Sequence, residues 1–218
     1  MQSSLGTIGE LRFGAPPIVA GRFISESLSA FIKHNPNCSV VLRTGLVSEL
    51  RAMLDRGQID FMLGPQGVVD LEEGLEFKHL IDDRVGILCR IAHPLTRQKK
   101  ILPENLKAQS WLLHSKGSLL RQQTEAAMVA AKIATVQTTI ETDSIRSALE
   151  IIANTDLITS MPRATTRPYL ENNLVFLNFD SPHFQRPLGI IRRLDASDSP
   201  LEKQFLKVLS SCIEKNSI

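Results

Sequence analysis

The chain has 218 residues, of which 43% are apolar and 22% charged, and its formal net charge is +2 at neutral pH. These values are those of an ordinary globular protein, so they exclude wholesale disorder, and the small charge argues against nucleic-acid binding by this chain. Residues 1–7 lack the basic region and the apolar run of a secretory signal, and no stretch approaches the roughly 20 apolar residues that a membrane span needs. Cys38, Cys89 and Cys212 are far apart and odd in number, which favours reduced, packed thiols in a cytoplasmic protein over a metal or nucleophile role.

The first part of the chain is predicted to run strand, helix, strand, helix, strand. Alternating or continuous apolar runs predict strands at residues 10–14, 39–43 and 59–63. Helical spacing gives the two intervening helices apolar faces of Ile24, Leu28, Phe31 and Ile32, and of Leu46, Leu50, Met53 and Leu54. Asn35-Pro36 ends the first helix and Gly57 ends the second. Such strands separated by amphipathic helices are typical of a parallel sheet covered on both faces.

The middle of the chain repeats this order. Residues 75–91 read as extended structure, residues 85–91 are the predicted first crossing between lobes, and a short helix follows at 103–106. Strands are then predicted at residues 111–113, 136–140 and 157–160, with a helix at about 119–131 and another whose apolar face is Ile145, Ala148, Leu149 and Ile152. Thr142, Asp143 or Ser144 is expected to cap the second of these helices.

The C-terminal part contains two extended stretches and one helix. Residues 174–179 are predicted to be extended, and residues 187–192 form the predicted return crossing. Ser199-Pro200-Leu201-Glu202 combines an N-cap serine, proline at the first helical position and glutamate at the third, so a helix is expected to begin here. Its predicted apolar face is Leu201, Phe205, Val208, Leu209 and Cys212.

The doubled order predicts an α/β protein of two Rossmann-like lobes joined by two crossing strands. Lobe I is predicted to comprise residues 1–85 and 187–218, and lobe II residues 86–186. Two such lobes facing each other across a cleft suit a small ligand, so the sequence favours a ligand-sensing or ligand-carrying protein.

Several phrases, in this order and spacing, resemble the effector-binding domain of LysR-type bacterial transcriptional regulators across nearly the whole chain. They are Gly9–Gly14, Phe31–Pro36, Val40–Gly45, Leu54–Asp60, Ala92–Leu95 and Ser199-Pro200. The resemblance implies a fold of the type 2 periplasmic-binding-protein kind, which senses a metabolite and pairs into homodimers or homotetramers. It implies antiparallel pairing through residues 23–33 of one subunit and 119–131 of another. It further implies that DNA is bound only by an N-terminal winged helix-turn-helix domain, which is expected to be missing from this chain.

Ligand contacts are predicted at strand C-terminal ends and helix N-termini, where unpaired N–H groups favour a carboxylate or another anion. In lobe I these positions are Ala15, Pro16, Pro17, Ile18, Gly45, Leu46, Val47, Gly64 and Pro65. In lobe II they are Ser115, Gly117, Ser118, Thr142, Asp143, Ser144, Ser160, Met161 and Pro162.

The chain departs from the family in lobe I. Many relatives carry serine or threonine where this sequence has Ala15-Pro16-Pro17 and Leu46-Val47, and the two prolines remove backbone donors. The expected ligand is therefore an organic acid with an apolar portion against lobe I. Its polar contacts would come mostly from Ser115, Ser118, Thr142 and Ser144.

Simpler interpretations of these residues stay open. Ser118, Thr142 and Ser144 are equally explained as helix caps, and Asp143 as a cap or as a group that repels an anion. His114 is expected to be an ordinary strand-end histidine and Trp111 a core residue. The scattered His34, His79, His93 and His183 suggest no metal site.

Two other functions are compatible with this type of fold. A solute-binding protein of a transport system would share the fold, but the lack of an export signal and the unpaired cysteines argue against it. An enzyme is disfavoured because no nucleophile elbow, phosphate loop or carboxylate–histidine arrangement is present, and no cofactor is expected.

Overall fold

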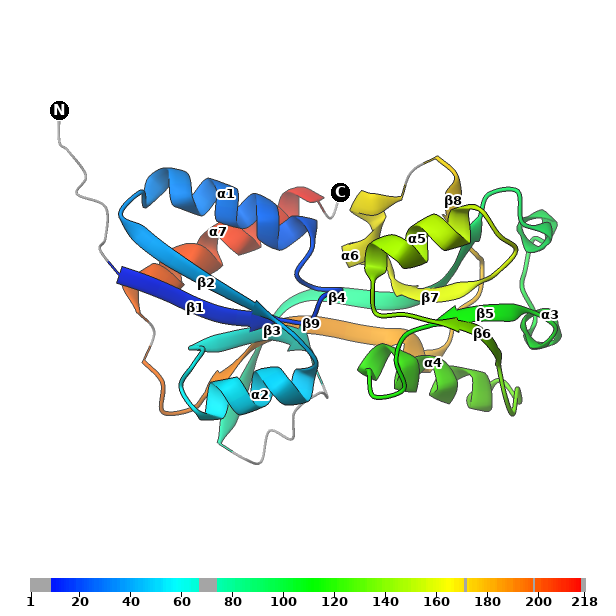
Figure 1. The fold of residues 1–218 in the computed structure, drawn as a ribbon, viewed down its shortest axis with the longest axis horizontal. Coiled ribbons are helices and arrows are strands. Elements are labelled where there is room, and N and C mark those ends of the chain that lie inside the picture. Colours follow the sequence, from blue (N-terminus) through cyan, green and yellow to red (C-terminus); the bar gives the residue numbers. More distant parts are fainter. Residues whose placement is uncertain (1–8, 67–73, 171, 198, 217–218) are drawn as a thin grey trace. The chain divides into compact units, whose positions relative to one another are not determined.

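A computed structural model describes residues 9–66, 74–170, 172–197 and 199–216 (Figure 1). The chain divides into a first unit, residues 1–81 with 187–218, and a second unit, residues 82–186. Residues 1–7, for which no secretory signal is predicted, lie outside the described residues. In the described ranges, no helix combines the length and apolar character needed to cross a bilayer.

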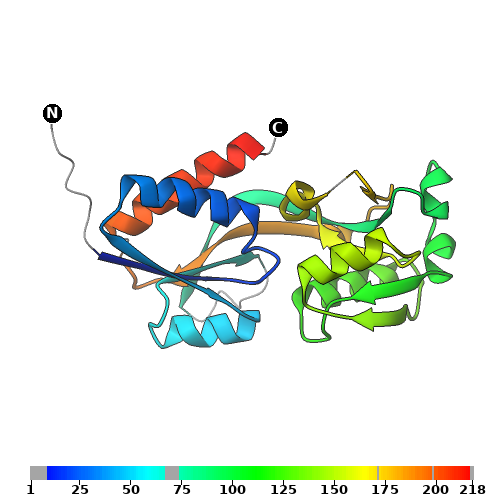
Figure 2. The same cartoon turned by 45° about the horizontal axis from the view of Figure 1, so that its top comes forward.

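The first unit has three parallel strands with helices on both faces of their sheet. Its elements are β1 (Gly9–Ala15), α1 (Arg22–His34), β2 (Cys38–Thr44), α2 (Val47–Asp55), β3 (Phe61–Pro65) and α7 (Pro200–Asn216). β1 pairs in parallel with β2 on one side, where Gly9 is opposite Cys38, and with β3 on the other, where Phe13 is opposite Phe61. Figure 2 shows α1 and α7 together on one face of this sheet and α2 on the other.

Two long strands have residues in both units. β4 (Leu75–Arg90) crosses the division between Ile81 and Asp82, and β9 (Gln185–Arg193) crosses it between Arg186 and Pro187. In the first unit, β9 runs antiparallel to β3, with Gly64 opposite Gly189. A Cβ atom on Gly189 would lie 2.4 Å from the backbone oxygen of Lys78, so only glycine allows β4 and β9 to approach so closely.

The second unit repeats the plan of the first. Its elements are η1 (Pro94–Arg97), α3 (Pro103–Lys107), β5 (Ser110–Leu113), α4 (Leu119–Ala130), β6 (Gln137–Glu141), α5 (Ile145–Ala153), β7 (Thr159–Pro162), α6 (Arg163–Thr166), η2 (Arg167–Tyr169), β8 (Leu174–Phe176) and η3 (Pro182–Phe184). β5 pairs in parallel with β6, and a parallel bridge joins Trp111 to Ile158 just before β7. β4 runs antiparallel to β7 and to β8.

In each unit, the first of three parallel strands along the chain therefore lies between the second and the third. A long antiparallel strand then pairs with the third: β9 with β3 in the first unit and β4 with β7 in the second. This repeated arrangement confirms the predicted α/β class of fold. Each unit also has its own apolar core, with Phe13, Phe31, Phe61 and Phe205 buried in the first and Trp111 and Phe184 in the second.

Helix boundaries follow the local signals closely. Gly57 has a φ of 65°, the left-handed conformation that ends α2 as predicted. Ser118 caps α4 and Ser144 caps α5, each through its side-chain oxygen. At α7, the Ser199 hydroxyl oxygen accepts a hydrogen bond from the Glu202 amide at 3.1 Å.

Four predicted features are wrong in detail. Ile32 was expected on the apolar face of α1 but is 41% exposed, because its position eight residues after Ile24 lies at the edge of the buried stripe. Leu46 precedes α2 and is exposed rather than part of its apolar face. β3 begins at Phe61 and β7 at Thr159, each two residues later than predicted, although Ile59 is buried in the core all the same.

Candidate ligand-binding site

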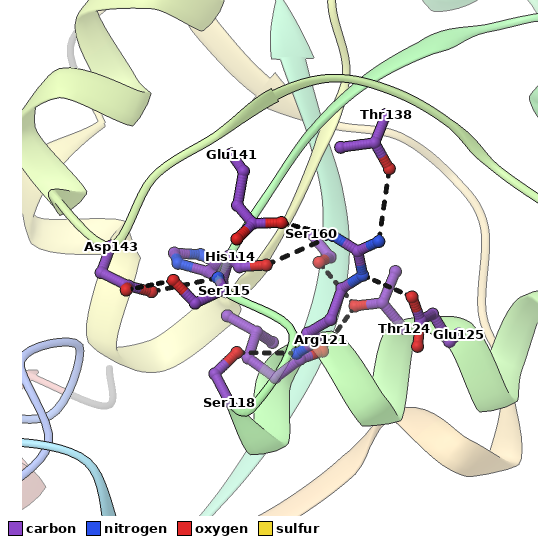
Figure 3. A network of polar contacts seen from close by, with 11 residues as sticks. His114, Ser115, Ser118, Arg121, Thr124, Glu125, Thr138, Glu141, Asp143 and Ser160 are labelled. Carbon is purple, nitrogen blue, oxygen red and sulfur yellow. Dashed lines mark hydrogen bonds and ion pairs between the residues drawn. The ribbon is translucent and has the colours of Figure 1, made fainter.

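Most of the predicted positions of the second unit lie around the C-terminal ends of β5 and β6, and Figure 3 shows Ser115, Ser118 and Asp143 among them. The turn after β5 is closed by a hydrogen bond from the Ser118 amide to the Ser115 carbonyl, at 2.9 Å. The Ser118 hydroxyl oxygen then accepts the Arg121 amide at 3.2 Å, which begins α4. Gly117 is exposed, and no described atom lies within 4 Å of the position of an added Cβ.

Asp143 links this turn to the loop between β6 and α5. The Ser115 amide donates to Asp143 Oδ1 at 3.1 Å, and the Ser115 hydroxyl donates to Asp143 Oδ2. Asp143 is exposed and Ser115 is half-buried. The carboxylate therefore already occupies both hydrogen-bond donors of Ser115.

The other hydroxyls of this loop also have partners within the chain. Thr142 Oγ1 accepts the Ser144 amide at 3.2 Å, and Ser144 Oγ accepts the Ser147 amide at 3.2 Å. The structure thus shows capping and turn-forming roles for Ser118, Thr142 and Ser144. Their contact with a ligand stays a prediction.

The end of β7 lies inside the second unit. Ser160 and Met161 are fully buried, and the Ser160 hydroxyl shares a hydrogen bond of 2.6 Å with the Thr124 hydroxyl of α4. Pro162 is buried as well and is opposite Val85 of β4. Of the predicted positions in this unit, those at the ends of β5 and β6 are consequently the accessible ones.

Arg121 holds these loops together and was not singled out by the sequence. Its side chain is only 7% exposed, and it donates to the His114 carbonyl and to the Thr138 hydroxyl, both at 3.3 Å (Figure 3). Glu125 and Glu141 balance its charge. Nothing in the local sequence separates such an arginine from a solvated one on a helix surface, because its partners come from three separate elements.

His114 is another buried titratable group of this region. Its side chain is 5% exposed, and burial lowers its pKa to about 4, an effect that the negative charge of Asp143 opposes. Within the described part of the chain, its Nε2 atom has no hydrogen-bond partner. The imidazole is therefore neutral at physiological pH, and its Nε2 atom is both buried and unpaired.

We expect His114 to make the protein less stable in mild acid. Its folded pKa of about 4 is below the unfolded value of 6.5, so the unfolded chain binds the extra proton and stability falls as the pH falls from about 6.5 to 4. Urea unfolding at pH 7 and pH 4.5 should show that His114→Gln removes about 2–3 kcal/mol of this loss. The exposed His183 provides the control, since His183→Gln should leave the loss unchanged. An equal loss in wild type and His114→Gln would contradict the assignment.

The predicted positions of the first unit offer few polar groups. Ala15 and Pro16 are buried at the end of β1, and Gly64 and Pro65 are buried in β3. At the start of α2, the Leu46 amide donates to Glu49 Oε2 at 2.8 Å, so this helix N-terminus also carries a carboxylate from the chain itself.

Of the remaining predicted positions of the first unit, Pro17 and Ile18 lie in the connection after β1, Gly45 lies in the connection after β2, and Val47 is the first residue of α2. Trp111 is fully buried in the core of the second unit. Among the residues that the structure describes, no three His, Cys, Asp or Glu side chains are grouped so as to hold a metal ion.

Comparison with known proteins identifies the family. The family model described as "LysR substrate binding domain" matches residues 5–211. The HTH-type transcriptional regulator PcaQ of Agrobacterium fabrum is 23% identical over 190 residues, which are 87% of this chain and 61% of PcaQ. The chain thus spans less than two thirds of this relative.

Solved structures of the same kind share the fold. The CcmR regulatory domain of Synechocystis in complex with 2-PG has a TM-score of 0.82 and 20% identity, with 94% of this chain and 98% of that one covered. The effector binding domain of QuiR in complex with shikimate has a TM-score of 0.76 and 16% identity, with 96% and 99% covered. The predicted periplasmic-binding-protein type of fold is confirmed by this likeness, and the chain belongs to the LysR substrate binding domain family.

Proposed function

We propose that this chain is the effector-sensing part of a LysR-type transcriptional regulator. The observation that carries the proposal is the family match over residues 5–211, on a fold of two α/β units that share two long strands. The names of the similar structures support it, since one domain was solved with 2-PG and another with shikimate. A small metabolite would then favour one arrangement of the domain and so change transcription through DNA-binding segments that lie elsewhere in the whole protein.

The proposed contacts are the accessible strand ends of both units. In the second unit they centre on Ser115, Ser118 and Thr142, and in the first on Pro17, Ile18 and Val47, which would meet an apolar part of the ligand. The division into lobes at residues 85/86 and 186/187 belongs to the same proposal. We assign no catalytic role to the site, because its family is one of regulatory domains.

Assembly and location complete the proposal. Antiparallel pairing would place residues 23–33 of one subunit against residues 119–131 of another, giving a homodimer or homotetramer. Cys38, Cys89 and Cys212 all lie in the described part of the chain, and none of them forms a disulfide. Reduced cysteines are typical of cytoplasmic proteins, so they support a cytoplasmic location.

A thermal-shift screen tests the proposal. The chain would be screened against aromatic acids, amino acids, sugar alcohols, dicarboxylates and fatty acids. An effector at about one hundred times its Kd adds roughly 2.7 kcal/mol to the free energy of unfolding, which should raise Tm by roughly 5–10 °C. Ser118→Ala and Thr142→Ala should both reduce this shift.

Ser199→Ala is the matched control for these variants. Ser199 also caps a helix through its hydroxyl, at the start of α7, and no ligand contact is proposed there. It should lower the Tm of the free protein as Ser118→Ala does, but leave the ligand-induced shift intact. Equal ligand shifts in all three variants would remove Ser118 and Thr142 from the site. A full-length regulator whose DNA binding responds to no compound would overturn the proposed function.

A further inference from the structure

The chain itself supplies a carboxylate at two of the positions where an anion is expected to bind. Glu49 accepts the Leu46 amide at the start of α2, and Asp143 accepts the amide and the hydroxyl of Ser115 at the end of β5. Backbone N–H groups at such positions are the usual partners of a bound carboxylate or phosphate. Here they are already satisfied before any ligand binds.

The position in the second unit is the better defined of the two. Asp143 uses both carboxylate oxygens on Ser115, in the way that a bidentate ligand carboxylate would. The Asp143 side chain is exposed, so its remaining lone pairs are accessible from solvent. A carboxylate accepts about four hydrogen bonds, and Ser115 donates only two of them.

His114 gives an independent indication that a ligand binds beside this carboxylate. Its side chain is 5% exposed, its Nε2 atom has no partner among the described residues, and it directly precedes Ser115. An unpaired buried nitrogen is costly unless something binds to it. Since burial keeps the ring neutral, it brings no positive charge that would attract a second anion to Asp143.

We propose that Asp143 is a built-in carboxylate of the ligand site, and that the second unit holds its effector through a group that donates hydrogen bonds, such as a hydroxyl, an amide N–H or an ammonium. The inference rests on the proposed function, since it names the chemistry of that same ligand. It replaces the expected carboxylate contact at Ser115, because a ligand carboxylate there would have to displace Asp143 or lie against its negative charge. An acidic group elsewhere on the ligand is compatible with it.

Chemical rescue with acetate tests this inference without knowledge of the effector. Asp143→Ala leaves the Ser115 amide and hydroxyl without their acceptor and should lower Tm by about 2–4 °C. Sodium acetate should restore part of this loss in a saturable way, while sodium chloride at equal ionic strength should not. Wild type should show no acetate-specific rise, because Asp143 already fills the position.

Glu150→Ala is the matched control. Glu150 is an exposed carboxylate on the neighbouring helix α5, paired with Arg146, and its loss should create no acetate effect. If acetate stabilises wild type as much as Asp143→Ala, or stabilises neither, the inference is overturned.

NMR on wild type gives a second measurement that does not depend on the stability of the variant. The Ser115 amide resonance should stay in place when acetate is added, and a saturable shift would overturn the inference. These outcomes are separate from those of the effector screen. A carboxylate compound that binds at Ser115 would contradict the role of Asp143 while leaving effector sensing intact, whereas a successful rescue with no effector found would leave the proposed function unsupported.

Discussion

Replacing Asp83 with alanine is expected to lower the free energy of unfolding by about 3–5 kcal/mol, and Tm by roughly 10 °C. Asp83 lies in β4 near the start of the second unit and is 3% exposed. Its carboxylate accepts the Ala164 amide at 2.8 Å and the Arg84 amide at 2.7 Å. The variant would leave both donors without this acceptor, and the Ala164 amide belongs to the first turn of α6.

A further part of the expected cost comes from Arg186. This side chain, the last residue of the second unit, is 3% exposed, and burial lowers its pKa to about 10 against the opposing charge of Asp83. It remains charged at neutral pH. Its Nη1 atom donates a hydrogen bond to Gln123 Oε1 at 2.9 Å. Without Asp83, this buried positive charge would lose a negative charge that offsets it, and an uncompensated buried charge is destabilising.

A double-mutant cycle separates this charge effect from the lost hydrogen bonds. Arg186→Met removes the charge and keeps an unbranched side chain that can pack in the core, so Asp83→Ala combined with Arg186→Met should lose less stability than the two single variants added together. Trp111, the single tryptophan, is buried in the core of the second unit, so its fluorescence reports the unfolding of that unit. Asp180→Ala is the control, because it removes an exposed partner of Arg84 and should cost under about 1 kcal/mol. If Asp83→Ala also cost under about 1 kcal/mol, the buried charge of Arg186 would not depend on Asp83 for its stabilisation.

Phe205→Ala is expected to destabilise the first unit by about 3–5 kcal/mol. Phe205 is fully buried on α7, and its ring centroid lies 4.9 Å from that of Phe13, 5.6 Å from that of Phe31 and 6.3 Å from that of Phe61. Alanine would leave a cavity between α1, α7 and the sheet, and would remove aromatic contacts worth about 0.5–1.5 kcal/mol each.

Urea unfolding followed by far-UV circular dichroism measures this effect. Leu194→Ala is a suitable control, because Leu194 is a large apolar residue of the first unit that is 62% exposed, and its loss should change stability by about 0.5 kcal/mol or less. If Phe205→Ala were as mild as Leu194→Ala, the four phenylalanines would not form the stabilising centre of the first unit.

Local signals predicted most of the fold. Gly57 ends α2 in the left-handed conformation, and Ser199 opens α7 with the expected cap. The information for such features lies within a few neighbouring residues, since propensities and caps act over one helical turn. The order of elements in both units follows from the same kind of signal.

Features that depend on distant residues could not be predicted in this way. The turn α6 is held by Asp83, about eighty positions earlier in the chain, and no signal near Ala164 marks it. Likewise, the sequence placed Ser115 and Asp143 at the ends of neighbouring strands, but not in contact with each other. Whether a hydroxyl is available to a ligand or used by the chain depends on such tertiary partners, which is why the candidate site was less predictable than the fold.

The division of the chain has a consequence for its synthesis on the ribosome. The second unit is one continuous stretch, residues 82–186, whereas the first unit needs residues 187–218 as well as residues 1–81. Phe205 reaches the core that it shares with Phe13 only after residues 82–186 have emerged. Domains usually complete their folding from the N-terminus onward during translation. The first unit therefore begins to emerge before the second unit but completes its folding after it. Until α7 emerges, one apolar face of its parallel strands stays exposed to solvent.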